Sequence, residues 1–243
     1  MRIELKENIE NLYEVFKQYK GNPSMEGSPV YGHINEWSQE LFSKPLRSLS
    51  DDDLLRFTGK VMTTWGEVAD LKHFIPRMLE LTALYIPPYE IWIIFDKLTL
   101  ANWKDWPLKE MQAIEAFMYE LWKDLLHDES NNAQYNFLDY FSTLTHFITD
   151  FDKLLSIWLD NTETTATKHL STLIIEGNHT LFHKGIISGF ENKENNAVAL
   201  KNWLLTDEIS DRLSATFFAN EKSDYTDKYS EAEKIISDHL KLK

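Results

Sequence analysis

The stretch that decides the fold is TTWGEVADLKHFIPRMLELTAL, from Thr63 to Leu84. Gly66 lies just before a helical pattern, and two prolines, at positions 87 and 88, follow that pattern. Glycine and proline commonly mark the ends of helices. Within the pattern, apolar residues recur with the spacing of one face of an amphipathic helix, at Leu71, Phe74, Met78, Leu81 and Tyr85. The stretch therefore predicts a helix that packs into the core.

Pro76 lies inside this pattern and leaves two arrangements open. In a continuous helix, the proline cannot make the hydrogen bond to the carbonyl of Lys72 and kinks the axis. Proline is better tolerated in a first turn, so a short turn over residues 67–74 could instead lead into a helix that begins near Ile75. In that case Asp70 and His73 lie at the junction, where one of them can satisfy backbone groups.

Helical periodicity continues along nearly the whole chain, and no segment reads as a convincing strand. The 243 residues include only 8 Gly and 7 Pro. An all-β chain of this length usually needs more of these turn residues. Ser50 and Asp53 have the spacing of a capping box and predict a helix with an inner face that reaches Trp65. The segment 89–101 is apolar nearly all round, which predicts a helix buried in the middle of the fold.

About ten helical segments with short connections predict consecutive antiparallel hairpins. We expect a single all-helical domain over residues 1–243. Hairpins that pack side by side give an irregular α–α superhelix of the HEAT or ARM kind, and a closed helical bundle is the alternative.

Composition narrows the classes of function. The net charge of −14 disfavours nucleic acid and anionic membrane surfaces; it permits a basic protein partner, although acidity also serves solubility. The chain has no Cys, which excludes disulfides, thiolate zinc sites and Cys nucleophiles. The longest apolar run is too short to span a bilayer and the charged N-terminus has no signal-peptide core. We therefore expect a cytoplasmic protein.

A polar stripe runs beside the apolar one, at spacing i, i+3, i+7 and i+10: Asp70, His73, Arg77 and Glu80. One interpretation is a small acid/base or anion-binding cluster, with Arg77 as a planar fork for a carboxylate and His73 as a titrating group. The interpretation that we favour is structural, since ion-pair networks of this kind are common without function. In that case the stripe locks this helix to its neighbours.

Two other groups of residues are candidate sites. Glu176, His179 and His183 have spacings found in metal sites, but a di-iron site needs further Glu residues and the general-base Glu of H-E-x-x-H is missing. We therefore expect no metal and no cofactor. Most tryptophans fall on apolar faces and are expected in the core. Trp103 and Trp106 lie in a connection, and if both are exposed they mark a binding surface.

The stretch from Gly66 to Leu81 also resembles a family of uncharacterised bacterial proteins. The shared pattern is Gly-acidic-x-x-Asp-hydrophobic-basic-His-Phe-hydrophobic-Pro-Arg-hydrophobic-Leu-Glu-Leu, here GEVADLKHFIPRMLEL. Similar pieces occur at 106–122 and 203–218. The resemblance implies an all-helical domain and transfers neither an activity nor a functional residue.

The expected function is a non-catalytic helical scaffold for protein–protein interaction, since the chain lacks glycine-rich phosphate loops, nucleophile elbows and calcium loops. The rival is an enzyme, or a bundle that binds a small ligand or metal, with its site near Asp70, His73 and Arg77 or at His179 and His183. A deep pocket lined by His73 and Arg77 would favour the rival.

Overall fold

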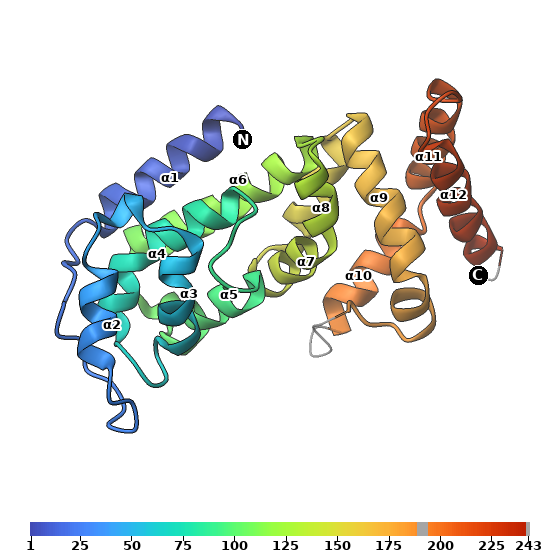
Figure 1. The fold of residues 1–243 in the computed structure, drawn as a ribbon. Coiled ribbons are helices and arrows are strands. Elements are labelled where there is room, and N and C mark those ends of the chain that lie inside the picture. Colours follow the sequence, from blue (N-terminus) through green and yellow to red (C-terminus); the bar gives the residue numbers. More distant parts are fainter. Residues whose placement is uncertain (189–193, 242–243) are drawn as a thin grey trace. The chain divides into compact units, whose positions relative to one another are not determined.

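The computed structural model describes residues 1–188 and 194–241, and over these residues the chain is all-α (Figure 1). The described part contains twelve α-helices and no strand, with one isolated bridge between Gly27 and Trp65. The predicted all-helical class is confirmed, whereas the superhelical arrangement stays a prediction. None of the described helices is both long and apolar enough to cross a bilayer.

Contacts group the chain into two compact units, Met1–Leu121 and Trp122–Lys243, and each is described by itself. The prediction of a single domain stays a prediction. The first unit contains α1 (Ile3–Phe16), α2 (Ile34–Leu41), α3 (Asp51–Lys60), α4 (Val68–Ala83), α5 (Ile91–Leu100) and the beginning of α6 (Leu108–His127), with the 3-10 turns η1 (Leu46–Ser48) and η2 (Trp103–Asp105).

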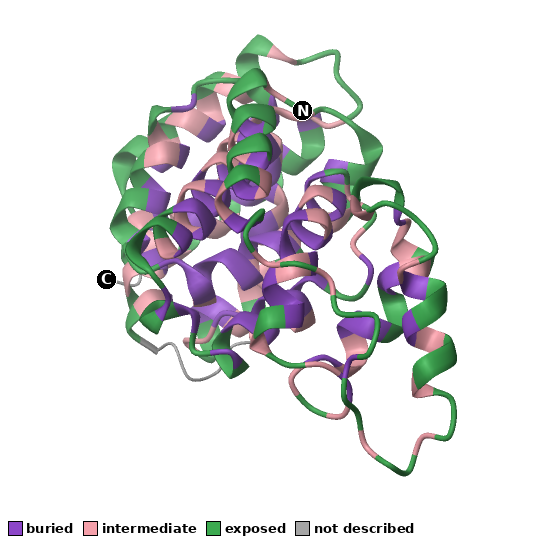
Figure 2. Cartoon of the chain, turned by 90° about the vertical axis from the view of Figure 1, so that its left-hand side faces the viewer, coloured by how far each residue is buried: buried purple, intermediate pink, exposed green. Residues whose placement is uncertain are grey.

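Helix α4, formed by the deciding stretch, is the central helix of the first unit. It contacts α1, α3, α5 and η1, and its apolar stripe is buried as predicted. Figure 2 shows the buried residues on the inner sides of the helices and the exposed residues on their outer sides. Burial of this stripe is the main apolar contribution that the stretch makes to folding, because stabilisation scales with apolar area removed from water.

Helix α4 runs unbroken through Pro76, so the alternative of a turn followed by a helix from Ile75 is wrong. The start of the helix is fixed two residues after Gly66, which has φ +79°, a conformation that favours glycine. Asp70 caps this start, since its Oδ2 accepts the backbone N–H of Glu67 at 2.9 Å. Trp65 was predicted on the preceding helix, but α3 ends earlier, at Lys60.

Two predictions about tryptophan burial are wrong. Helix α5 is not enclosed, because it packs on α3 and α4 and leaves Trp92 48% exposed. Trp103 and Trp106, in contrast, are buried, so they do not mark a binding surface. Trp106 Nε1 donates to the carbonyl of Ala101 at 2.9 Å, and its ring meets the ring of Phe16 from α1. The connection before α6 is therefore part of the core.

The second unit is built around α9 and contains α7 (Asn131–Phe147), α8 (Phe151–Asp160), α9 (Thr164–Gly177), the π-helical turn η3 (Asn178–His183), α10 (Glu194–Leu204), α11 (Asp207–Ala219) and α12 (Thr226–Leu240). The rings of Trp122 and Trp158 meet edge to face, with centroids 5.2 Å apart, which is a favourable aromatic geometry. Arg212 of α11 donates to the carbonyls of Trp158 and Asn161 at 3.0 and 2.5 Å and so holds the C-terminal end of α8.

Candidate functional site

The polar stripe of α4 contacts neighbouring segments of the first unit. Besides the capping role of Asp70, His73 Nδ1 lies 3.0 Å from the carbonyl oxygen of Tyr19, and its ring stacks on Phe42. Burial lowers the pKa of His73, because it disfavours the charged imidazolium. His73 therefore serves as a neutral, half-buried contact between α4 and the segments that follow α1 and α2.

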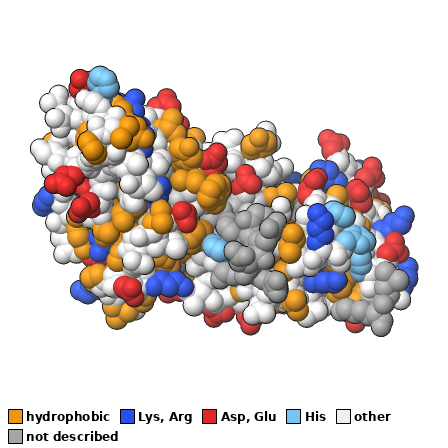
Figure 3. Space-filling view, turned by 90° about the horizontal axis from the view of Figure 1, so that it is seen from below, with side chains coloured by type: hydrophobic (Ala, Val, Ile, Leu, Met, Phe, Trp, Pro, Cys, Tyr) orange, Lys and Arg blue, Asp and Glu red, His pale blue; other side chains and the backbone are white. Residues whose placement is uncertain are grey.

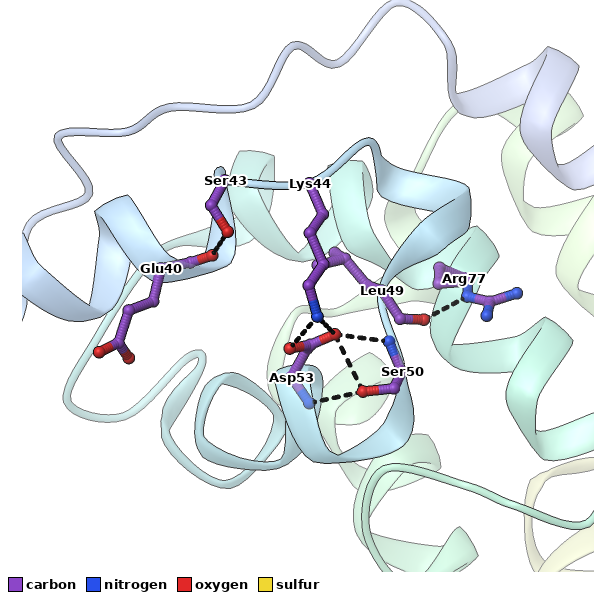
Figure 4. Close-up of polar contacts among 7 residues, drawn as sticks. All are labelled: Glu40, Ser43, Lys44, Leu49, Ser50, Asp53 and Arg77. Atoms are coloured by element: carbon purple, nitrogen blue, oxygen red, sulfur yellow. Dashed lines mark hydrogen bonds and ion pairs between the residues drawn. The ribbon is translucent and has the colours of Figure 1, made fainter.

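Arg77 and Glu80 make the remaining contacts of the stripe. Arg77 Nε donates to the carbonyl of Leu49 at 2.8 Å (Figure 4), and its Nη1 donates to Glu80 Oε2 at 2.7 Å. Glu80 also accepts the hydroxyl of Tyr13 at 2.5 Å. These bonds tie α4 to α1 and to the segment after η1, as the structural interpretation expects. A binding role for the stripe stays a prediction.

A buried ion pair that sequence reasoning missed lies at the centre of the first unit. Lys72 Nζ is 2.7 Å from Glu110 Oε2, and the two side chains are 8% and 2% exposed. Tyr19 donates to Glu110 Oε1 at 2.6 Å, and the ammonium of Lys72 lies 4.2 Å from the centre of the Trp106 ring. The cluster joins α4 and α6 to the end of α1.

The sequence carried one signal for this cluster. Lys72 precedes Ile75 and Leu79 by three and seven positions, so it belongs to a second apolar face of α4. A lysine on such a face needs a partner, because a buried charge is costly unless it is paired.

The buried pair borders a hollow of about 740 Å³, called here the loop hollow, which is lined by Tyr19, Lys72 and residues 26–28 and 62–69. The charge of Lys72 is already neutralised by Glu110. Burial, together with the bond to Glu110, raises the pKa of Tyr19, so its hydroxyl stays protonated as a donor. The cluster thus offers a ligand neither a free cation nor a free carboxylate.

A second hollow lies between α3 and the connection from α4 to α5. This α3 hollow has a volume of about 760 Å³ and is lined by residues 51, 52, 55, 56, 59, 60 and 87–90. Its apolar wall includes Leu55, which is 47% exposed, together with the two prolines and Tyr89. Ile86 and Trp92, neighbours of this wall in the chain, are also exposed. Exposed apolar residues that gather around a hollow are typical of interaction sites.

A third, smaller and more enclosed space lies on the other side of α3. This tryptophan cavity has a volume of about 260 Å³ and is lined by Trp37, Glu40, Leu41, Asp52, Asp53, Leu55, Arg56 and Trp65. Asp52, Leu55 and Arg56 also line the α3 hollow, so the outer face of α3 separates the two. We call the α3 hollow, the tryptophan cavity and the ridge at Leu55 the α3 surface. His73 and Arg77 line none of the three spaces described.

The start of α3 is held by the predicted capping box, which the structure confirms (Figure 4). The backbone N–H of Ser50 donates to Asp53 Oδ2 at 2.9 Å, and that of Asp53 donates to Ser50 Oγ at 3.2 Å. Lys44 Nζ lies 2.7 Å from the same carboxylate. The bonds to Lys44 and Ser50 lower the pKa of Asp53 to about 2. The ridge of the α3 surface is therefore anchored at its N-terminal end.

His179 and His183 lie on the π-helical turn η3 of the second unit, with ring centroids 5.8 Å apart. Helix α9 ends at Gly177 and passes directly into η3, so the break expected at Gly177 is a change from α- to π-helical geometry rather than an interruption. Among residues 1–188 and 194–241, no group of three or more His, Asp or Glu side chains is placed to hold a metal ion. Figure 3 shows histidine side chains next to Lys and Arg side chains on the C-terminal half.

Comparisons with models of known protein families, with curated proteins and with solved structures find no match for this chain. The resemblance of residues 66–81 to a bacterial family therefore stays a prediction, and function has to be inferred from the geometry alone.

We expect Lys72→Met to lower the free energy of unfolding by about 3–5 kcal/mol, because it leaves the charge of Glu110 buried without its partner. Urea denaturation followed by tryptophan fluorescence measures this loss. In the double variant Lys72→Met/Glu110→Gln, a neutral amide keeps an acceptor for Tyr19, so most of the lost stability should return. A single variant as stable as the unmodified chain would contradict the structural role of the pair.

We expect Asp53→Asn to destabilise the chain at neutral pH by an amount that disappears in acid. The pKa of Asp53 is lowered from 3.8 to about 2 on folding, so its carboxylate contributes stability above pH 4 that is lost as the pH falls towards 2. Thermal unfolding of both chains between pH 2 and pH 6 measures the difference. A difference that stays constant over this range would show that the charge of Asp53 does not hold α3.

Proposed function

We propose that the chain is a non-catalytic interaction protein whose α3 surface binds a basic, partly apolar segment of another protein. The observation that carries the proposal is the exposed ridge at Leu55 between two hollows. The predicted superhelical arrangement and cytoplasmic location fit this role and remain part of the proposal.

The apolar contribution to binding comes from side chains that folding leaves in water. Leu55, Tyr89 and Trp92 are exposed, although full burial of a leucine side chain alone usually contributes about 1.5–3 kcal/mol. Tyrosine and tryptophan also dominate the binding energy of many interfaces. Figure 3 shows hydrophobic side chains spread over one face of the N-terminal half. A partner segment that covers the ridge would remove part of this area from water.

The charges around the α3 surface select the chemistry of the partner. Asp51, Asp52 and Glu90 line the α3 hollow together with Arg56 and Lys60, so acidic side chains outnumber basic ones there. Asp51 and Asp52 form no ion pair with the described residues. The whole chain carries a net charge of −14. Charge complementarity steers encounter and suppresses wrong partners, so a basic segment fits this surface and an acidic one does not.

Catalysis has less support from the same geometry. The residues of the polar stripe, which include the rival site at Asp70, His73 and Arg77, are engaged by backbone groups and neighbouring side chains of the first unit. The buried Lys72–Glu110 pair beside the loop hollow is internally neutralised. In contrast, the α3 surface presents the exposed side chain of Leu55 and the carboxylate of Asp52, which forms no ion pair within the described part of the chain. Exposed apolar groups of this kind are typical of binding sites.

We expect Leu55→Ser to weaken the binding of a selected peptide at least about tenfold, because it removes the apolar ridge at the centre of the surface. The peptide would be isolated from a phage-displayed random library panned on the full chain, and its affinity measured by fluorescence polarisation. Leu108→Ser is the matched control, since Leu108 is 61% exposed and lines neither hollow of the α3 surface.

Selected peptides should contain arginine or lysine next to apolar residues. The proposal is contradicted if the two serine variants bind the peptide equally well, or if selection on the full chain enriches acidic sequences.

A further inference from the structure

The tryptophan cavity has the size of a pocket for one side chain. Its volume of about 260 Å³ lies below the roughly 300–1,000 Å³ that is usual for sites of drug-sized ligands. The rings of Trp37 and Trp65 meet edge to face in its wall, with centroids 5.7 Å apart. An aromatic wall attracts cations through the negative face of the ring.

Three carboxylates complete the wall, and they differ in their partners. Asp53 is held by Lys44 and by the backbone of Ser50. Figure 4 shows the carboxylate of Glu40 turned away from that group; Glu40 pairs instead with Arg56 Nη1 at 3.3 Å, and both side chains are exposed. Asp52 has no ion-pair partner among the described residues. Asp52 is therefore available to a cation that enters the cavity, and Glu40 becomes available when Arg56 is displaced.

The chain's own cations already occupy the aromatic faces beside the cavity. Arg56 Cζ lies 4.8 Å from the centre of the Trp37 ring, and Lys60 Nζ lies 3.9 Å from that of Tyr31. The site thus suits guanidinium and ammonium groups. An exposed ion pair such as Glu40–Arg56 contributes little to stability, so another cation can replace Arg56 at low cost.

A second observation concerns one of the two tryptophans that line the cavity. Trp65 Nε1 is buried and has no hydrogen-bond partner in the described part of the chain. Buried donors are nearly always paired, and an unpaired one requires an explanation. Trp65 lines both the tryptophan cavity and the loop hollow, and a ligand oxygen that reached the indole nitrogen would accept this hydrogen.

We infer that the tryptophan cavity binds an arginine or lysine side chain of the partner, in the place that Arg56 holds in the free chain. The inference rests on the proposed function and names the part of the partner that the α3 surface selects.

The test uses a single-residue probe and the full chain. N-acetyl-L-arginine amide is titrated into the ¹⁵N-labelled protein, and the indole N–H signals of Trp37 and Trp65 are followed by NMR. The expected result is a saturable shift of both signals with a millimolar Kd. N-acetyl-L-citrulline amide, which has nearly the same shape without the charge, should produce no saturable shift. Equal shifts from the two probes, or none from either, would overturn the inference.

Three variants test whether the arginine probe binds in the tryptophan cavity. Glu40→Gln should weaken the arginine probe about threefold or more, since a charged hydrogen-bond partner is lost. Arg56→Gln should tighten it by a similar factor, because the competing internal cation is gone. Glu36→Gln, on the same helix but outside the cavity, is the matched control and should leave the Kd unchanged. A weaker or unchanged Kd in Arg56→Gln would contradict displacement of Arg56.

The experiments distinguish failure of the cavity inference from failure of the proposed binding surface. If selected peptides require Leu55 but the protein does not distinguish arginine from citrulline, the cavity inference alone is wrong. If the arginine probe binds as expected but peptides do not require Leu55, the cavity stands and the wider binding surface does not.

Discussion

The buried contact between Lys72 and Glu110 is the constraint on which the first unit depends. Two charges have been removed from water, and this is tolerable only because each is paired and hydrogen-bonded. The pair requires α4, α6 and the end of α1 to stay in one arrangement, since Tyr19 bonds to the same carboxylate. The polar stripe on α4 adds bonds to α1 and to the segment before α3. Polar groups here determine which helices pack together, while the apolar stripe supplies the driving force.

The α3 surface differs from α4 in how its side chains are used. Most ionisable groups of α4 are used internally. The outer face of α3, the connection before α5 and the first turn of α5 keep Leu55, Tyr89 and Trp92 in water. Helix α3 is itself well anchored, by its capping box and by packing on α4 and α5. An anchored helix that presents an apolar ridge between two hollows is pre-organised, and pre-organisation lowers the entropic cost of binding.

Local patterns predicted the helices but not the surfaces between them. The period of Leu71, Phe74 and Met78 and the spacing of Ser50 and Asp53 are local, so the sequence was sufficient to place α4 and the start of α3. The local cost of Pro76 suggested a break that burial of α4 overrides. The burial of Trp106 depends on Phe16 of α1, and the cavity depends on the contact between Trp37 and Trp65. Such contacts join residues far apart in the chain, and no single segment encodes them.

The most direct test of the central claim, that the α3 surface is the binding face of the chain, is amide hydrogen exchange of the full chain with and without a peptide selected on it. We expect the peptide to slow exchange in α2, in α3 and in residues 86–92, with little change along the polar stripe of α4. Slowed exchange that is confined to the second unit, or that centres on His73 and Arg77, would contradict the claim.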